Sequence, residues 1–120
     1  MLTMNVTVDE IGGAPLLEAQ GEIDHGSCAP LQLALDAALE SGNEIVFVDL
    51  REVTYIDSGG LSVLLSGVRR LRDKGWLGVI GPNHNVRRLL EIVGLLVDSS
   101  FRLFDSPASA QQAAAERASV

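Results

Sequence analysis

The residues best suited to chemistry stand together at Asp57-Ser58-Gly59-Gly60, near the middle of a chain of 120 residues. A serine hydroxyl can accept a phosphoryl group. The two glycines let the backbone bend tightly and leave the hydroxyl unshielded. An apolar helical pattern follows, and a helix N-terminus stabilises a phosphate through its free N–H groups and partial positive charge. The pattern therefore predicts an accessible serine that can carry a phosphate.

Two other roles are open to residues of these types. Asp57 or Ser58 fits a helix N-cap, the commonest role for these residue types at such a position, and a capping hydroxyl would still be accessible to modification. A serine hydrolase is disfavoured, because the nucleophile-elbow pattern Gly-x-Ser-x-Gly requires a glycine where Ile56 stands. Neither His25 nor His84 is placed as a catalytic base by any motif.

Composition excludes several classes of protein. Acidic residues outnumber basic ones 16 to 9, which gives a formal charge of −7 and disfavours nucleic-acid binding. A single cysteine, Cys28, cannot form an internal disulfide, and with two histidines far apart no metal site or cofactor is expected. No apolar run approaches the ~20 residues that span a bilayer. The first residues also lack the pattern of a signal peptide, so we expect a cytoplasmic protein that does not bind membranes.

The elements that must position the serine follow from hydrophobic periodicity. Residues 5–9 and 15–20 read as a hairpin around Gly12-Gly13, and residues 26–41 as a helix. Apolar strands are predicted at 45–50, 76–80 and 101–104, and helices at 61–71, 86–93 and 107–118. The order β-β-α-β-α-β-α-β-α indicates an α/β fold with a mostly parallel, mixed sheet of about five strands and four helices. We expect one domain over residues 1–120, with its core at about 5–105.

Three segments carry a resemblance to a known family. Residues 48–61, ending in Asp57-Ser58-Gly59-Gly60-Leu61, combine a strand ending in Asp-Leu, a short link and an Asp-Ser turn that opens a helix. Residues 21–24 read Gly-Glu-Ile-Asp, and residues 81–95 hold Gly-Pro, an apolar and basic helix, and Gly-Leu. In this order and spacing the segments resemble STAS domains, specifically those of anti-sigma factor antagonists. The resemblance covers about residues 5–105.

The resemblance implies a role for each residue of the turn. Ser58 would be the phosphate acceptor, and Asp57 would orient the serine or the incoming phosphoryl group with its Mg²⁺. The ATP and the catalytic groups would come from a partner kinase, so the chain would be a substrate and not an enzyme. Gly59 stands where many members carry a second Ser or Thr. That position therefore lacks a hydroxyl that could support recognition, and also lacks a competing acceptor.

The resemblance also implies a partner switch. Unphosphorylated, the protein would bind an anti-sigma factor of the serine-kinase type and release its sigma factor; phosphorylation at Ser58 would end this binding, and a metal-dependent phosphatase would restore it. The implied partner surface comprises Glu22, Asp24, His25, Asp57, Ser58, Gly59, Gly60 and Leu61. For residues 21–25 a plain solvated loop is an equal alternative, with Asp24 or Ser27 capping the following helix.

A second hypothesis keeps the fold and changes the function. The chain would then be a STAS interaction module of a stress-signalling scaffold or a lipid-transport assembly, in which Ser58 need not be phosphorylated. The intact Asp57-Ser58 pair favours the antagonist.

Overall fold

Five strands and four α-helices alternate in the computed structural model, which describes residues 4–118. Their order confirms the predicted β-β-α-β-α-β-α-β-α arrangement, with one added 3₁₀ helix, η1. The elements are β1 (Asn5–Ile11), β2 (Ala14–Ile23), α1 (Ala29–Glu40), β3 (Ile45–Ile56), α2 (Ser58–Leu71), β4 (Trp76–Ile80), α3 (His84–Ile92), η1 (Leu95–Val97), β5 (Phe101–Phe104) and α4 (Pro107–Ala118).

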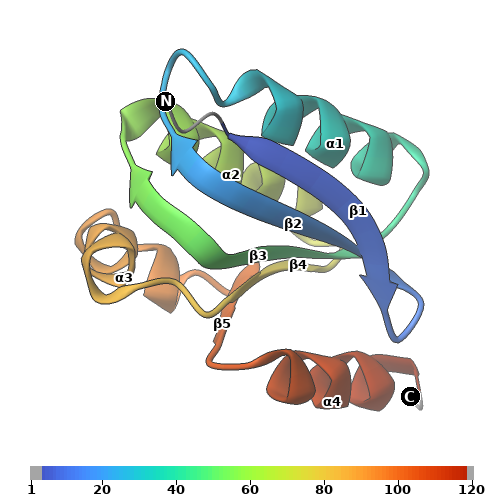
Figure 1. Cartoon of the computed structure of the whole chain (residues 1–120). Coiled ribbons are helices and arrows are strands. Elements are labelled where there is room, and N and C mark those ends of the chain that lie inside the picture. Colours follow the sequence, from blue (N-terminus) through green and yellow to red (C-terminus); the bar gives the residue numbers. More distant parts are fainter. Residues whose placement is uncertain (1–3, 119–120) are drawn as a thin grey trace.

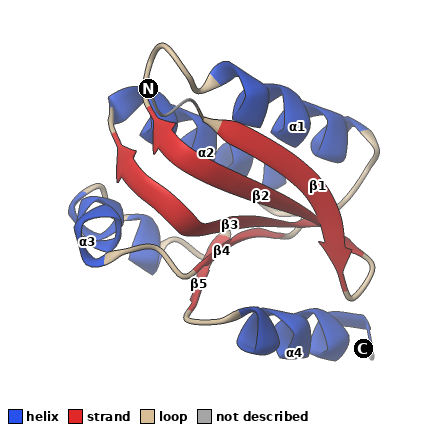
Figure 2. Ribbon diagram, in the orientation of Figure 1, coloured by secondary structure: helices blue, strands red, loops and turns tan. Residues whose placement is uncertain are grey.

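The five strands form one mixed sheet in the order β1-β2-β3-β4-β5 (Figure 2). The hairpin of β1 and β2 is antiparallel, whereas β2, β3, β4 and β5 pair in parallel. The predicted fold class, with an antiparallel edge on a parallel sheet, is confirmed. The carboxyl ends of β2 and β3 therefore lie at the same edge of the sheet as the start of α2 (Figure 1).

The largest differences from the prediction are two longer strands, one helix that starts later, and α2, which starts at Ser58 and not at residue 61. β2 continues to Ile23 and not to residue 20, and β3 to Ile56 and not to residue 50, because their ends pair with one another up to Ile23 opposite Ile56. Register shifts interrupt this pairing, and the added half of β3 is largely exposed, so it has no regular alternation. The helix predicted from residue 26 begins at Ala29, since a turn at residues 24–28 precedes it.

Helices cover both faces of the sheet, and each face has its own core. α1 and α2 lie on one face and α4 on the opposite face (Figure 1). Along β3, Val46 and Val48 point to the α1 and α2 side, while Phe47 belongs to the cluster beneath α4, as the two-residue period of a strand requires. Aliphatic side chains dominate the first core. The second holds Phe47 and Trp76, whose ring centroids lie 5.4 Å apart.

Asn83 fixes α3 beside the carboxyl end of β3. Its Oδ1 accepts a hydrogen bond from Val86 N at 2.8 Å and caps the helix, while its Nδ2 donates to the Val53 and Thr54 carbonyls at 3.3 and 3.4 Å. α3 therefore flanks the strand that leads into Ser58. Across residues 4–118, no helix has both the length and the apolar character needed to cross a bilayer.

The core beneath α4 can be tested by placing a charge in it. Ala110 is fully buried against the sheet, whereas Ala115 is exposed on the same helix. Ala110→Glu is expected to lower the free energy of unfolding by about 2–4 kcal/mol, because a carboxylate would be buried without a partner. Ala115→Glu is the matched control and should change it by less than about 0.5 kcal/mol. Chemical denaturation compares the two, and equal effects would contradict the packing described.

Candidate functional site

The turn between β3 and α2 is built by Asp57, which is the N-cap of the helix. Its backbone is extended, and its Oδ1 accepts hydrogen bonds from the N–H groups of Gly59 at 2.7 Å and Gly60 at 3.3 Å. Its own N–H donates to the Ile23 carbonyl at 3.1 Å, which joins the turn to the end of β2. The N-cap predicted at Asp57 or Ser58 is therefore Asp57, and Ser58 is the first residue of the helix.

Ser58 is exposed, and its hydroxyl meets a histidine from a distant part of the chain. Ser58 Oγ lies 3.0 Å from His25 Nε2, although the two residues are 33 positions apart. The expected proximity of the residue 21–25 segment to the serine turn is thus present in the structure. Either atom can donate, since the direction of the hydrogen bond depends on the tautomer of the imidazole. A nucleophile therefore lies on open surface beside a group that can hold or release a proton.

The two glycines after Ser58 allow β2 and α2 to approach this closely. A Cβ added at Gly59 would lie 2.8 Å from His25 N and 2.9 Å from both Cα and Nδ1 of that residue. A Cβ at Gly60 would lie 2.4 Å from Ile56 Cγ1 and 2.8 Å from the Ile23 carbonyl oxygen. Real Cβ atoms are not found at such distances, so both positions require glycine in this arrangement. Position 59 therefore has no room for a serine or threonine side chain, because His25 occupies the place where its Cβ would lie.

Residues 24–28 form a turn held by side-chain hydrogen bonds. Asp24 Oδ1 accepts from Gly26 N and from Ser27 Oγ, each at 2.9 Å, while Ser27 Oγ also lies 2.7 Å from the Glu22 carbonyl oxygen. The prediction that Asp24 or Ser27 caps the next helix is wrong: the N-cap of α1 is Cys28, and no side chain caps it. Asp24 and Ser27 instead bond to each other and fix the loop that carries His25.

The predicted partner surface divides into exposed and buried residues. Glu22, His25 and Ser58 are exposed, and Asp24 and Asp57 are half-buried, so these five can meet a partner as they stand. Their part in binding stays a prediction. Gly59, Gly60 and Leu61 are buried, and the two glycines serve the packing of α2 against the end of β2; the part of these three residues in binding also stays a prediction.

One motif residue has a structural role that sequence reasoning missed. Asp49, in the Asp-Leu strand ending, is 5% exposed and receives the Arg51 guanidinium, with Nη2 to Oδ2 at 2.8 Å, and the Arg51 N–H at 2.9 Å. The hydrogen bond to Asp49 raises the pKa of Arg51 above its ordinary value. The buried carboxylate is therefore paired, as burial of a charge requires. Both of its hydrogen-bonding groups belong to Arg51 of the same strand, so Asp49 stabilises β3 and does not contact the serine turn.

The pair of Ser58 and His25 falls short of a hydrolytic triad. Within residues 4–118, the His25 ring makes no hydrogen bond besides the one to Ser58, so no carboxylate orients it. Nor does the described part of the chain contain a cluster of three or more His, Cys, Asp or Glu side chains that could hold a metal.

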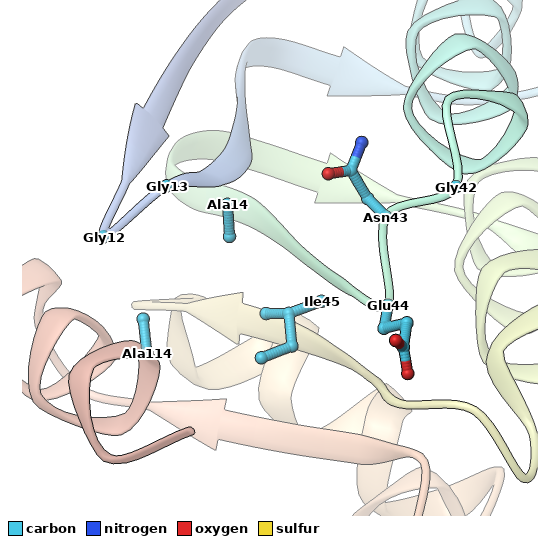
Figure 3. Close-up of a pocket in the computed structure, with 8 residues that line it drawn as sticks. All are labelled: Gly12, Gly13, Ala14, Gly42, Asn43, Glu44, Ile45 and Ala114. Atoms are coloured by element: carbon cyan, nitrogen blue, oxygen red, sulfur yellow. The ribbon is translucent and has the colours of Figure 1, made fainter. Parts of the chain in front are cut away.

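A shallow cleft of about 280 Å³ lies at the other end of the sheet from Ser58. Figure 3 shows its lining by the β1–β2 turn, the segment entering β3 and Ala114 of α4. Asn43 and Glu44 are its polar side chains, and Asn43 Nδ2 already donates to the Ala38 carbonyl at 2.8 Å. No residue of the serine turn reaches it. The cleft thus contains none of the groups singled out for chemistry.

Known proteins share both this sequence pattern and this fold. A family model described as "Mlab, STAS domain" matches residues 6–98. The chain belongs to the STAS-domain family of anti-sigma factor antagonists. It is 29% identical over 104 residues to the anti-sigma-F factor antagonist RsfB of Mycobacterium tuberculosis, which covers 87% of this chain and 84% of RsfB.

Solved STAS structures superpose along most of the chain. A crystal structure of an anti-sigma factor antagonist from Mycobacterium paratuberculosis matches with a TM-score of 0.83 and 24% identity, covering 94% of this chain and 95% of the other. The phosphorylated form of the Bacillus cell fate determinant SpoIIAA matches with a TM-score of 0.71 and 14% identity, covering 91% and 99%. These likenesses establish the STAS fold that was predicted from residues 5–105.

The contact of His25 with Gly59 can be tested by restoring a side chain at position 59. Gly59→Ser is expected to destabilise the protein by about 1–3 kcal/mol, because its Cβ overlaps the His25 backbone. Gly26→Ser is the control, since a Cβ there would lie 3.5 Å from Asp24 Oδ1, an ordinary contact. Thermal and chemical unfolding measure the difference. A Gly59→Ser protein as stable as Gly26→Ser would show that the loop yields freely.

Proposed function

We propose that this STAS protein is a cytoplasmic anti-sigma factor antagonist whose binding is switched off by phosphorylation of Ser58. The observation that carries the proposal is the position of Ser58. Its hydroxyl is exposed at the first residue of α2, next to the N-cap Asp57 and the two glycines that follow it. The name of RsfB and the family membership support the antagonist class. The partner is an anti-sigma factor with serine-kinase activity, and the chain itself acts as its substrate and not as an enzyme.

The chemistry at Ser58 is a phosphoryl transfer carried out by the partner. A bond forms between Ser58 Oγ and the γ-phosphorus of ATP, the bond from that phosphorus to the oxygen of the leaving ADP breaks, and the hydroxyl proton is released. Asp57 has its Oδ1 engaged by Gly59 and Gly60, so its first task is to hold the turn open toward the kinase. Reversal requires hydrolysis of the phosphoserine by a separate phosphatase, of the metal-dependent kind.

Charge explains how a phosphate would end binding without a change of fold. Phosphoserine adds about −1.5 to −2 charges at neutral pH. The two segments that meet here already carry Glu22, Asp24 and Asp57, in a chain with a formal charge of −7. A partner surface complementary to the unphosphorylated site then faces both desolvation of a dianion and repulsion from any acidic group of its own.

An apolar groove extends the contact surface beyond the serine turn. About 360 Å³ in volume, it lies between the end of β3 and α3, with Tyr55, Leu89 and Ile92 in its lining. Tyr55 is 50% exposed and Ile92 69% exposed, and Val93 beside them is 43% exposed. Exposed apolar groups gathered in one place are typical of protein interfaces. The lining of the groove reaches Ile56, two residues before Ser58, so one partner can cover both.

A second candidate is a STAS module that works without phosphorylation, in a scaffold or a lipid-transport assembly. The observation that favours it is the description of the matching family model, which names Mlab. Such a module would use the same exposed face for a permanent partner. The response of Ser58 to a kinase separates the two candidates.

Phosphorylation at Ser58 is tested by intact mass. Incubation with Mg²⁺-ATP and a serine-kinase anti-sigma factor from the same cell should add one phosphate to the wild type and none to Ser58→Ala. Ser62→Ala is the control, because Ser62 is also exposed and lies one helical turn further along α2. It should still gain the phosphate.

The alternatives give different masses and binding data. A phosphate that persists in Ser58→Ala would place the acceptor elsewhere and overturn the assignment. Binding to the kinase with no phosphate would leave an antagonist controlled by affinity or abundance. The absence of both would favour the scaffold or transport module.

The groove is tested with two exposed apolar residues of matched accessibility. Ile92→Ser is expected to weaken binding of the anti-sigma factor about tenfold, since a well-packed apolar contact at an interface is worth roughly 1–2 kcal/mol. Val8→Ser is the control: Val8 is 67% exposed on β1, on the far side of β2 from β3. Calorimetry or surface-based binding gives both affinities. Equal affinities for the two variants would remove α3 from the interface.

A further inference from the structure

His25 is positioned to respond to a phosphate on its neighbour. Its Nε2 lies 3.0 Å from Ser58 Oγ, the atom that would carry the phosphorus. Two features determine the position of the ring. Gly59 has no Cβ and so leaves room for it, and the hydrogen bonds of Asp24 with Gly26 and Ser27 fix the loop that carries it. Both partners of the hydrogen bond are exposed, so a phosphate can be accommodated without opening the core.

The helix N-terminus alone offers little to this phosphate. The N–H groups of Gly59 and Gly60, which would ordinarily receive an anion at such a site, donate to Asp57 Oδ1. The N–H of Leu61 donates to the Asp57 carbonyl within the helix. A phosphate on Ser58 would have to displace the cap to reach the two glycine donors, which leaves the imidazole as the side-chain donor already in place.

The surrounding acidic side chains make a cationic partner for the phosphate favourable. In residues 21–28 and 57–61, the two segments that meet at Ser58, the titratable groups apart from His25 are Glu22, Asp24, Cys28 and Asp57. None of them is a base that is cationic at neutral pH. His25 is thus the group in these segments that can become positively charged, by taking a proton from solvent on its second ring nitrogen.

We propose that His25 is the internal partner of phosphoserine 58: protonated on both ring nitrogens, it pairs with the phosphate and holds it against the start of α2. The inference rests on the proposed phosphorylation of Ser58 and names how this chain accommodates it. In the unphosphorylated protein the same ring orients the hydroxyl. His25 is therefore a positioning residue in both states, and Gly59 is its structural requirement.

The experiment uses the full chain with phosphoserine incorporated directly at position 58 during translation, so no kinase is needed. The chain has two histidines, and His84, exposed at the start of α3, is an internal control. Nitrogen-15 NMR of the rings at pH 7 is expected to show the ratio of doubly protonated to neutral His25 rising roughly threefold on phosphorylation, the size of an exposed ion pair. The His84 signals should stay unchanged.

The phosphate gives the reciprocal measurement. In a phosphorus-31 NMR titration, His25→Gln is expected to raise the pH midpoint of the phosphoserine by roughly half a unit, because the dianion loses a positive partner. His84→Gln should leave the midpoint where it is in the wild type. Thermal unfolding of both variants confirms that each is folded.

The outcomes separate this inference from the proposed function. A His25 ring that is unaffected by a phosphate verified by mass, or a midpoint equal in His25→Gln and wild type, would overturn the pairing. A kinase that never modifies Ser58 would instead overturn the proposed function, while the protein with incorporated phosphoserine would still report whether His25 binds the phosphate.

Discussion

The close approach of the end of β2 to the start of α2 is the constraint on which the site depends. The Asp57 N–H donates to the Ile23 carbonyl at 3.1 Å, and Gly60 packs against Ile23 and Ile56 at distances that admit no side chain. The same approach carries the loop after β2 over Gly59 and places an imidazole beside the serine. Any residue larger than glycine at 59 or 60 would separate the two segments, and the arrangement of Ser58 and His25 would be lost with them.

The helix terminus serves two purposes that usually compete. A helix N-terminus can receive either a capping side chain or an external anion. Here Asp57 takes the first role and occupies the Gly59 and Gly60 donors. Ser58, one residue further on, is exposed, so a group attached to it would lie on open surface. Under the proposed phosphorylation, this division of roles would let the start of the helix keep its cap.

Most of the fold could be predicted from the sequence, because hydrophobic periods of 2 and 3.6 are local signals. The order of all nine strands and helices and the parallel sheet followed from them. The strand ends did not, since the last residues of β2 and β3 are fixed by pairing with each other and not by their own pattern. The prediction that Asp24 or Ser27 caps the next helix was wrong for a related reason, because the two side chains form a hydrogen bond with each other within a tight turn.

The site divides in the same way. The Asp57-Ser58 turn and its place at a helix start could be predicted, because they depend on neighbouring residues alone. The hydrogen bond between His25 and Ser58 could not, since it joins positions 33 residues apart and depends on how two elements dock. The local hint in the sequence was the glycine at position 59. The need for glycine there becomes clear only in the structure, where His25 lies too close to allow a Cβ.

The strand order has a consequence for how the chain assembles during synthesis. Every pair of neighbouring strands is also consecutive in sequence, so the sheet can grow in the order in which it leaves the ribosome, and the Ser58 face is complete once β3 and α2 have formed. α4 is the exception, for Ala114 packs at the β1–β2 turn near the other end of the chain. The nascent protein therefore exposes the aromatic face around Phe47 and Trp76 until its last helix is released, and that face is where co-translational association with other chains is most readily expected.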